Sequence, residues 1–124
     1  MLARLHTHKR SHYLTHYPNC PCASAQNNGG FMYFQTYDPQ VESMVMVSDS
    51  TFRSNIATHG SGGAFADIAG GESGMKIYRT KFEDNKASLG GGAIIMGGSK
   101  GLVLVDAEFV GNSAGSSGGA FQVD

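Results

Sequence analysis

The chain has 124 residues, enough for one domain, and its 18 glycines are roughly twice the average usage of about 7%, without the period of three that marks collagen. Nine basic and ten acidic residues give a net charge of −1, so no overall field favours a nucleic acid or another acidic polymer as partner. No apolar run approaches the roughly 20 residues that an α-helix needs to span a bilayer, so we expect no membrane span.

Residues 1–24 are expected to form a disordered leader. Every charged residue before Asp38 is basic. The segment is not a secretory signal as written, because His6, His8 and Lys9 interrupt its apolar stretch almost at once. An acid-free composition is compatible with an organelle transit sequence. We favour the alternatives, an arbitrary leader or a misplaced start codon in a longer gene.

Histidines and cysteines in the leader raise the possibility of a zinc or copper site, because both metals accept imidazole and thiolate ligands. The residues are His6, His8, His12, His16, Cys20 and Cys22. Their spacing lacks a second thiolate arm, and the prolines nearby disfavour a helix that would bring His12 and His16 to one face. We therefore expect no metal site and no cofactor. A disulfide between Cys20 and Cys22 would close a strained ring, which leaves the redox compartment open.

A repeat organises the rest of the chain, residues 25–124. Its three clear copies read FRSNIATHGSGGA, FEDNKASLGGGA and FVGNSAGSSGGA. Successive copies start 30 and 27 residues apart, a period typical of solenoids and other repeat arrays. The clear copies span about 45–64, 75–94 and 102–121, and the recurrent residues are Phe52, Asn55, Gly62, Gly63, Phe82, Asn85, Gly91, Gly92, Phe109, Asn112, Gly118 and Gly119. A degenerate copy is expected upstream, with Cys20 at the Phe position, Ala23 at the Asn position, and Ala25, Gly29 and Gly30 also aligned.

Each clear copy is preceded by a strand-like run with alternating apolar residues: Val45 and Val47, Met75 and Ile77, Leu102 and Leu104. The alternating apolar residues stand an odd number of positions before each Phe, whereas small residues stand two positions before it, on the same side of the strand as the Phe. Because the side-chain alternation shifts by one residue, we expect a bend or bulge three to four residues before each Phe. About three short strands per repeat follow, with no helical period. Since one copy cannot bury its own apolar face, the pattern predicts an all-β fold, a parallel β-helix of about three to four coils.

Stacked coils would place like residues in ladders. We expect Phe52, Phe82 and Phe109 to form an internal aromatic stack, and Asn55, Asn85 and Asn112 to form a ladder of amides at a turn. The glycines should form the sharp corners. Outside the stack, opposite charges should meet in two rows, one of Asp49, Arg79 and Asp106, the other of Thr51, Lys81 and Glu108.

The motif FxxN followed by GGA resembles the repeats of the chlamydial polymorphic outer membrane proteins, whose hallmark is FxxN with GGA[ILV]. The resemblance covers about residues 45–124. Only the middle copy has the aliphatic residue after GGA, Ile94, whereas the other two have Phe65 and Phe121. The resemblance implies a right-handed β-helix, displayed outside the cell or at its surface as part of a longer protein and used in adhesion.

The leading hypothesis is therefore a non-catalytic module of an adhesin-like protein, with a glycan or a host surface protein as a possible partner and coil ends that could self-associate. The alternative is a fragment of a carbohydrate-active enzyme, a polysaccharide lyase or hydrolase, which would need carboxylates converging on one face. Asp67 aligns with Met96 and Val123, so no second carboxylate joins it, and His59 is expected in a solvated loop. An ice-binding solenoid would need a flat threonine array, which the sequence lacks. We expect no catalytic residue.

Overall fold

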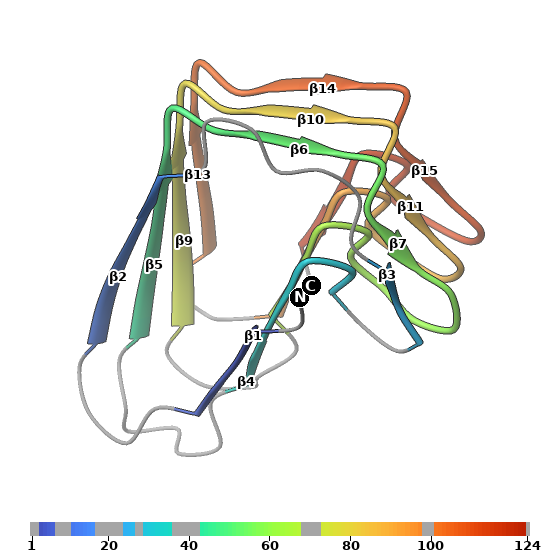
Figure 1. The fold of residues 1–124 in the computed structure, drawn as a ribbon, viewed down its shortest axis with the longest axis horizontal. Helices are drawn as coiled ribbons and strands as arrows, with labels where there is room; N and C mark the ends of the chain where they lie inside the picture. The colour runs from blue at the N-terminus through green and yellow to red at the C-terminus, as the bar shows by residue number, and fades with distance from the viewer. Residues whose placement is uncertain are drawn as a thin grey trace.

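The computed structural model describes residues 3–6, 11–16, 24–26, 29–35, 43–67, 73–97 and 101–123. These residues form β-strands joined by turns and contain no helix, and hence no helix able to cross a membrane (Figure 1). The strands are β1 Ala3–His6, β2 Ser11–His16, β3 Ser24–Ala25, β4 Met32–Gln35, β5 Ser43–Ser48, β6 Thr51–Arg53, β7 Ile56–Ala57, β8 Phe65–Asp67, β9 Ser73–Tyr78, β10 Lys81–Glu83, β11 Lys86–Ala87, β12 Ile94–Met96, β13 Gly101–Val105, β14 Glu108–Val110, β15 Ser113–Ala114 and β16 Phe121–Val123.

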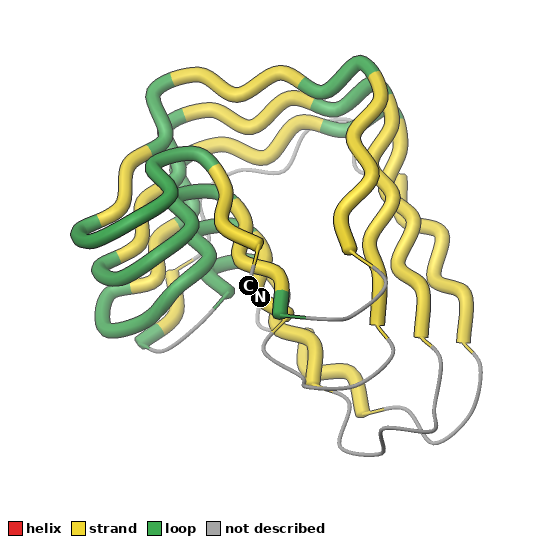
Figure 2. The backbone as a smooth tube through the Cα atoms, turned by 180° about the vertical axis from the view of Figure 1, so that it is seen from behind, coloured by secondary structure: helices red, strands yellow, loops and turns green. Residues whose placement is uncertain are grey.

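Equivalent strands of successive repeats lie directly beside one another, and all pairs are parallel. The sheet orders are β1-β4-β8-β12-β16, β14-β10-β6, β15-β11-β7-β3 and β13-β9-β5-β2. Strands β5–β8, β9–β12 and β13–β16 thus form three complete coils, which we call the first, second and third coil (Figure 2). The predicted parallel β-helix is confirmed.

Each complete coil contains four strands rather than about three, because the expected bend divides the first run in two. The bend lies three residues before each Phe, at Asp49, Arg79 and Asp106, whose φ angles are 47°, 44° and 53°. A left-handed backbone interrupts an extended strand and turns it toward a new direction. The hydroxyl groups of Ser50 and Thr80 stabilise this bend by donating to the carbonyls two residues earlier, at 2.6 and 2.8 Å.

The core runs along the inside of the coils. Its aromatic stack is as predicted: the rings of Phe52 and Phe82 are 5.3 Å apart at 20°, and those of Phe82 and Phe109 are 4.9 Å apart at 7°. Phe65 packs edge-on against Phe52, with centroids 4.6 Å apart. Offset and edge-on rings suit the aromatic quadrupole, so this column both fills the core and favours one register of the coils.

Two segments within the expected leader are described as strands. Within residues 1–24 it describes β1, which pairs with β4, and β2, which pairs with β5 from Ser11↔Ser43 to His16↔Ser48. Without β2, β5 would be an edge strand with unpaired backbone groups, and a neighbouring segment can pair with such groups whatever its side chains. The remainder of the predicted leader, apart from Ser24 in β3, lies outside the described residues.

The degenerate copy is present as a partial coil before the first coil. Ala25 pairs with Ala57, and the N–H groups of Gly29 and Gly30 donate to the carbonyls of Ser61 and Gly62, at 2.9 and 3.1 Å. The proposed Phe and Asn positions of this copy, Cys20 and Ala23, lie outside the described residues.

Candidate functional site

The buried asparagines form the polar centre of the molecule. The side-chain oxygen of Asn85 accepts from the Nδ2 and the backbone N–H of Asn55, at 2.8 and 3.0 Å. The oxygen of Asn112 accepts in the same way from Asn85, at 2.9 and 3.0 Å. The predicted amide ladder is therefore present, and its side-chain oxygens also accept from backbone donors that the sequence did not reveal.

The second hydrogen of each amide completes the ladder. Nδ2 of Asn85 donates to the carbonyl of Phe52 at 3.0 Å, and Nδ2 of Asn112 donates to the carbonyl of Phe82 at 2.9 Å. A buried amide is costly unless its donors and acceptors are paired. Because Asn85 uses both oxygen lone pairs and both Nδ2 hydrogens, it can stay in the core, and its role is structural.

A second left-handed residue precedes each Asn, which sequence reasoning missed. These residues are Ser54, Asp84 and Gly111, with φ angles of 54°, 52° and 65°. Two of the three are not glycine, so the pattern was hidden, although Gly111 in the third copy was an available signal. This conformation turns the chain between the Phe strand and the Asn corner.

The predicted glycine pairs form a corner of each coil, and the two glycines of a pair are required for different structural reasons. The first glycine of each pair has a positive φ: 69° at Gly62, 60° at Gly91 and 60° at Gly118. The second allows close approach of the coils, because a β-carbon on Gly92 would overlap the carbonyl oxygen of Gly119 and lie 2.7 Å from the backbone nitrogen of Ser113. These glycines are thus fixed by geometry.

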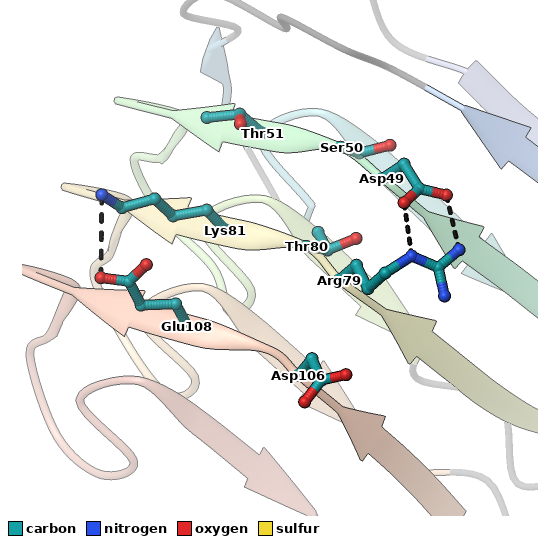
Figure 3. A pocket seen from close by; sticks show the side chains of 8 residues that line it. All are labelled: Asp49, Ser50, Thr51, Arg79, Thr80, Lys81, Asp106 and Glu108. Atoms are coloured by element: carbon teal, nitrogen blue, oxygen red, sulfur yellow. Dashed lines mark hydrogen bonds and ion pairs between the residues drawn. The ribbon is translucent and has the colours of Figure 1, made fainter.

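Charged residues outside the stack gather at an open recess of about 220 Å³ beside the bends (Figure 3). Arg79 donates to both carboxylate oxygens of Asp49, through Nε at 2.5 Å and a terminal nitrogen at 2.7 Å. The ammonium group of Lys81 lies 3.7 Å from a carboxylate oxygen of Glu108. The two predicted charge rows therefore pair between neighbouring coils.

A third charge row was not predicted. Glu83 lies one residue after Phe82 and contacts both Arg53 and Lys81 at 2.8 Å. The hydrogen bond from Lys81, followed by that from Arg53, lowers the pKa of Glu83. The hydrogen bond to Asp49 raises the pKa of Arg79, and that to Glu83 raises the pKa of Lys81. Each shift favours the charged form at neutral pH, as expected for structural ion pairs.

The candidate catalytic residues do not come together in the described part of the chain. Asp67 is buried in β8, its neighbours in register are Phe34 and Met96, and Val123 occupies the same position one coil further on. His59 is exposed, and its Nδ1 lies 3.2 Å from the hydroxyl of Thr58. Asp84 is an exposed turn residue. The positions equivalent to Asp67 in successive coils therefore supply no second carboxylate, so this row does not form the carboxylate pair of a glycosidase.

The metal hypothesis concerned the leader. In the part of the chain that the structure describes, no group of three or more His, Cys, Asp or Glu side chains could hold a metal ion. His8, Cys20 and Cys22 lie outside that part, and for His6, His12 and His16 only the backbone is described.

The ladder, the stack and the glycine corner together define one structural unit, and its best example is the second coil. Residues 79–94 match the Chlamydia polymorphic membrane protein repeat. No curated protein and no solved structure gives a significant match. The matched segment of this polymorphic membrane protein repeat begins at the bend residue Arg79, contains Phe82 and Asn85, and ends at Ile94 after the glycine corner. This repeat does not define an enzyme family.

Proposed function

We propose that the chain is a non-catalytic module of an adhesin-like protein, located at the cell surface or secreted, which presents variable loops on a repeated β-helical frame. The observation that supports the proposal is that each coil combines recurrent residues with structural roles and exposed loops whose residues vary. The recurrent residues of the second coil, Phe82, Asn85 and Gly92, are buried and in contact with neighbouring coils. These roles are structural, and the match to a membrane protein repeat supports display at a surface.

The loops that follow β7, β11 and β15 are the best candidates for contact with a partner. They project side by side from one corner of the coils (Figure 1). Their exposed tips differ from coil to coil: Thr58 and His59 in the first, Ser88 and Leu89 in the second, and Gly115 and Ser116 in the third. Leu89 is 52% exposed, so it offers a partner an apolar side chain at the tip of its loop. We propose a glycan or a host surface protein as the ligand.

Binding of the purified chain to a glycan array and to host cells tests this proposal. We expect binding that is lost in the double variant His59→Ala with Leu89→Ala. The matched control is Val103→Ala with Val110→Ala, because these side chains are 42% and 44% exposed but lie on other strands. The control variant should bind normally.

Two results would contradict the proposal. Absence of binding to every glycan and every host cell type would remove the adhesin role. Equal loss of binding in the loop variant and in the control would show that the loops are not the contact surface.

The carbohydrate-active alternative has no specific observation in its favour, since Asp67 is buried and its neighbours in register, Phe34 and Met96, are apolar. New reducing or unsaturated ends in pectin or alginate, abolished by Asp67→Ala, would revive it.

A further inference from the structure

We propose that the outer face of β5, together with the neighbouring position of β2, binds a soft monovalent metal ion, Cu(I). The ligands are the thioether sulfurs of Met44 and Met46 and the imidazole of His12. This site is separate from the loops that carry the proposed adhesin role and does not depend on that role. No residue of the third coil takes part in it.

The two methionines of β5 face away from the core. Val45 and Val47 are buried, whereas Met44 and Met46, which alternate with them, are partly exposed. Successive residues of a strand face opposite sides of its sheet, so both methionines lie on the outer side. The sheet of β2, β5, β9 and β13 forms one wall of the β-helix (Figure 1). The Met-Val-Met segment of this wall therefore presents two thioethers on one outward face.

The register of β2 adds a histidine to this face. β2 pairs with β5 in parallel, with His12 opposite Met44 and Leu14 opposite Met46. Residues in register on adjacent strands share a face, where neighbouring strands are about 4.8 Å apart and alternate residues of one strand about 6.6 Å apart. The three proposed ligands thus occupy adjoining positions. Ligands from the leader alone had unsuitable spacing, and the pairing with β5 brings in two ligands from outside it.

The chemistry of these ligands selects the kind of metal ion. Thioether sulfur and imidazole nitrogen suit Cu(I), whereas Mg²⁺ and Ca²⁺ prefer carboxylate and carbonyl oxygens. A methionine side chain has three rotatable bonds, so two sulfurs at alternate positions of a strand can converge on one ion.

The neighbours on the other side of β5 favour a singly charged ion. In β9, Gly74 lies in register with Met44, and Lys76 lies in register with Met46. Neither position supplies a carboxylate. The ammonium group of Lys76 repels a divalent ion twice as strongly as a monovalent one at the same distance. Charge and ligand type therefore both favour Cu(I) over Zn²⁺ or Ca²⁺.

Titration of the whole chain with Ag⁺ tests the site, after alkylation of the two cysteines so that their thiolates do not compete. Ag⁺ is a soft monovalent ion that replaces Cu(I) without redox chemistry. In NMR spectra of methyl-labelled methionine, we expect Ag⁺ to shift the signals of Met44 and Met46 and to leave those of the buried Met75 and Met96 in place. Zn²⁺ at the same concentration should shift none of them.

Substitutions then identify the ligands. Met44→Leu with Met46→Leu keeps the apolar volume and removes both sulfurs. Loss of a group that only orients a metal ligand costs about tenfold or more in affinity, so loss of these two ligands should weaken Ag⁺ binding by at least that factor. His12→Ala should weaken it by about tenfold. The matched controls are Met75→Leu, in the core, and His59→Ala, in an exposed loop, and both should bind Ag⁺ as the original chain does.

Four results would contradict the proposal. Unshifted signals of Met44 and Met46 in the chain without substitutions would overturn the site, whatever the stability of the variants. Equal weakening by Met75→Leu would show that the outward thioethers are not the ligands. Unchanged affinity in His12→Ala would remove the imidazole from the ligand set. Equal shifts with Zn²⁺ would contradict the preference for a soft monovalent ion.

Discussion

Asn85 is the residue at which the constraints from neighbouring coils meet. Its backbone N–H and Nδ2 bond to the oxygen of Asn112, while its own oxygen and the second Nδ2 hydrogen bond to Asn55 and Phe52. A coil shifted by one residue would break all of these bonds and turn its apolar side chains outward. The ladder therefore fixes register as well as satisfying buried polar groups.

Replacement of Asn85 by Leu should destabilise the fold strongly. The substitution removes the acceptor of the Asn55 amide and one donor to the Phe52 carbonyl, and each buried hydrogen-bonding group that loses its partner costs about 1–3 kcal/mol. We expect a loss of about 3 kcal/mol in the free energy of unfolding, measured by urea denaturation. Asn112→Leu is the control, because Asn112 is only partly buried and its side chain bonds to one neighbouring coil, whereas that of Asn85 bonds to two. Equal losses in the two variants would contradict a role for burial.

Gly92 and Gly119 occupy the same repeat position, but only Gly92 is followed by another coil in the structure. A β-carbon on Gly92 would overlap backbone atoms of the next coil, whereas on Gly119 it would lie 3.8 Å from the carbonyl oxygen of Asn112. We expect Gly92→Ala to cost about 3 kcal/mol in thermal unfolding, in the upper part of the range for single substitutions. Gly119→Ala should cost less than about 0.5 kcal/mol, as at unconstrained surface positions. A tolerated alanine at position 92 would show that the coils can move apart.

Sequence reasoning identified the residues with the most uniform roles. The Phe and Asn positions were predictable because the same side chain recurs in all three copies, at Phe82 and Asn85 and their equivalents. The left-handed positions were not, because Ser54 and Asp84 differ from Gly111 in type and share only their backbone conformation. A side-chain pattern can reveal a ladder of side chains, but it reveals a backbone angle only where glycine marks it.

At the scale of the strands, the bend explains why each coil has four strands although the sequence indicated about three. The alternation of side chains along the run before each Phe predicted a bend near Asp49, Arg79 and Asp106, and the structure has it there. This alternation of side chains could not show that the bend ends one strand and begins another. That depends on the φ angle of the bend residue rather than on which face each side chain occupies. The charge rows beside the bend were predictable in part, and the Glu83 row was missed because it has no charge in the third coil, where Val110 stands.

The ion pairs of Glu83 should make the stability of the fold depend on pH at the acid end. Because the folded state lowers the pKa of Glu83, its contribution is present above the unfolded value of about 4.3 and is lost as pH falls through the lower folded value. NMR titration should show that Lys81→Met raises the pKa of Glu83 more than Arg53→Met does, since the Lys81 hydrogen bond is the larger cause. A larger effect of Arg53→Met would reverse this assignment.

The raised pKa of Lys81 gives the opposite dependence at the basic end. Its contribution is present below the unfolded value of about 10.4 and is lost as pH rises through the higher folded value. Between these limits the pairs between β6, β10 and β14 are fully charged, so they favour the observed register across the neutral range.

For the whole molecule, the repeat period predicted the solenoid, and the predicted number of coils is compatible with three complete coils and one partial coil. What the sequence could not show is that β1 and β2 extend the sheets. Their pairing with β4 and β5 uses backbone groups at an edge, and backbone pairing leaves no signature in the side-chain pattern of a polar, histidine-rich segment.

Since each complete coil contacts only its neighbours, stability should vary along the β-helix. Native-state hydrogen exchange should find the highest protection in the second coil, at amides such as those of Lys86 and Ala93, which bond to coils on either side. The amides of the third coil should exchange through local opening of β13–β16, because their apolar rows are partly exposed. Gly92→Ala weakens the interface between the second and third coils, so it should lower protection in the third coil far more than in β5–β8. Uniform loss of protection in all coils would instead show that the molecule unfolds as a single cooperative unit, with no independent opening at its exposed edge.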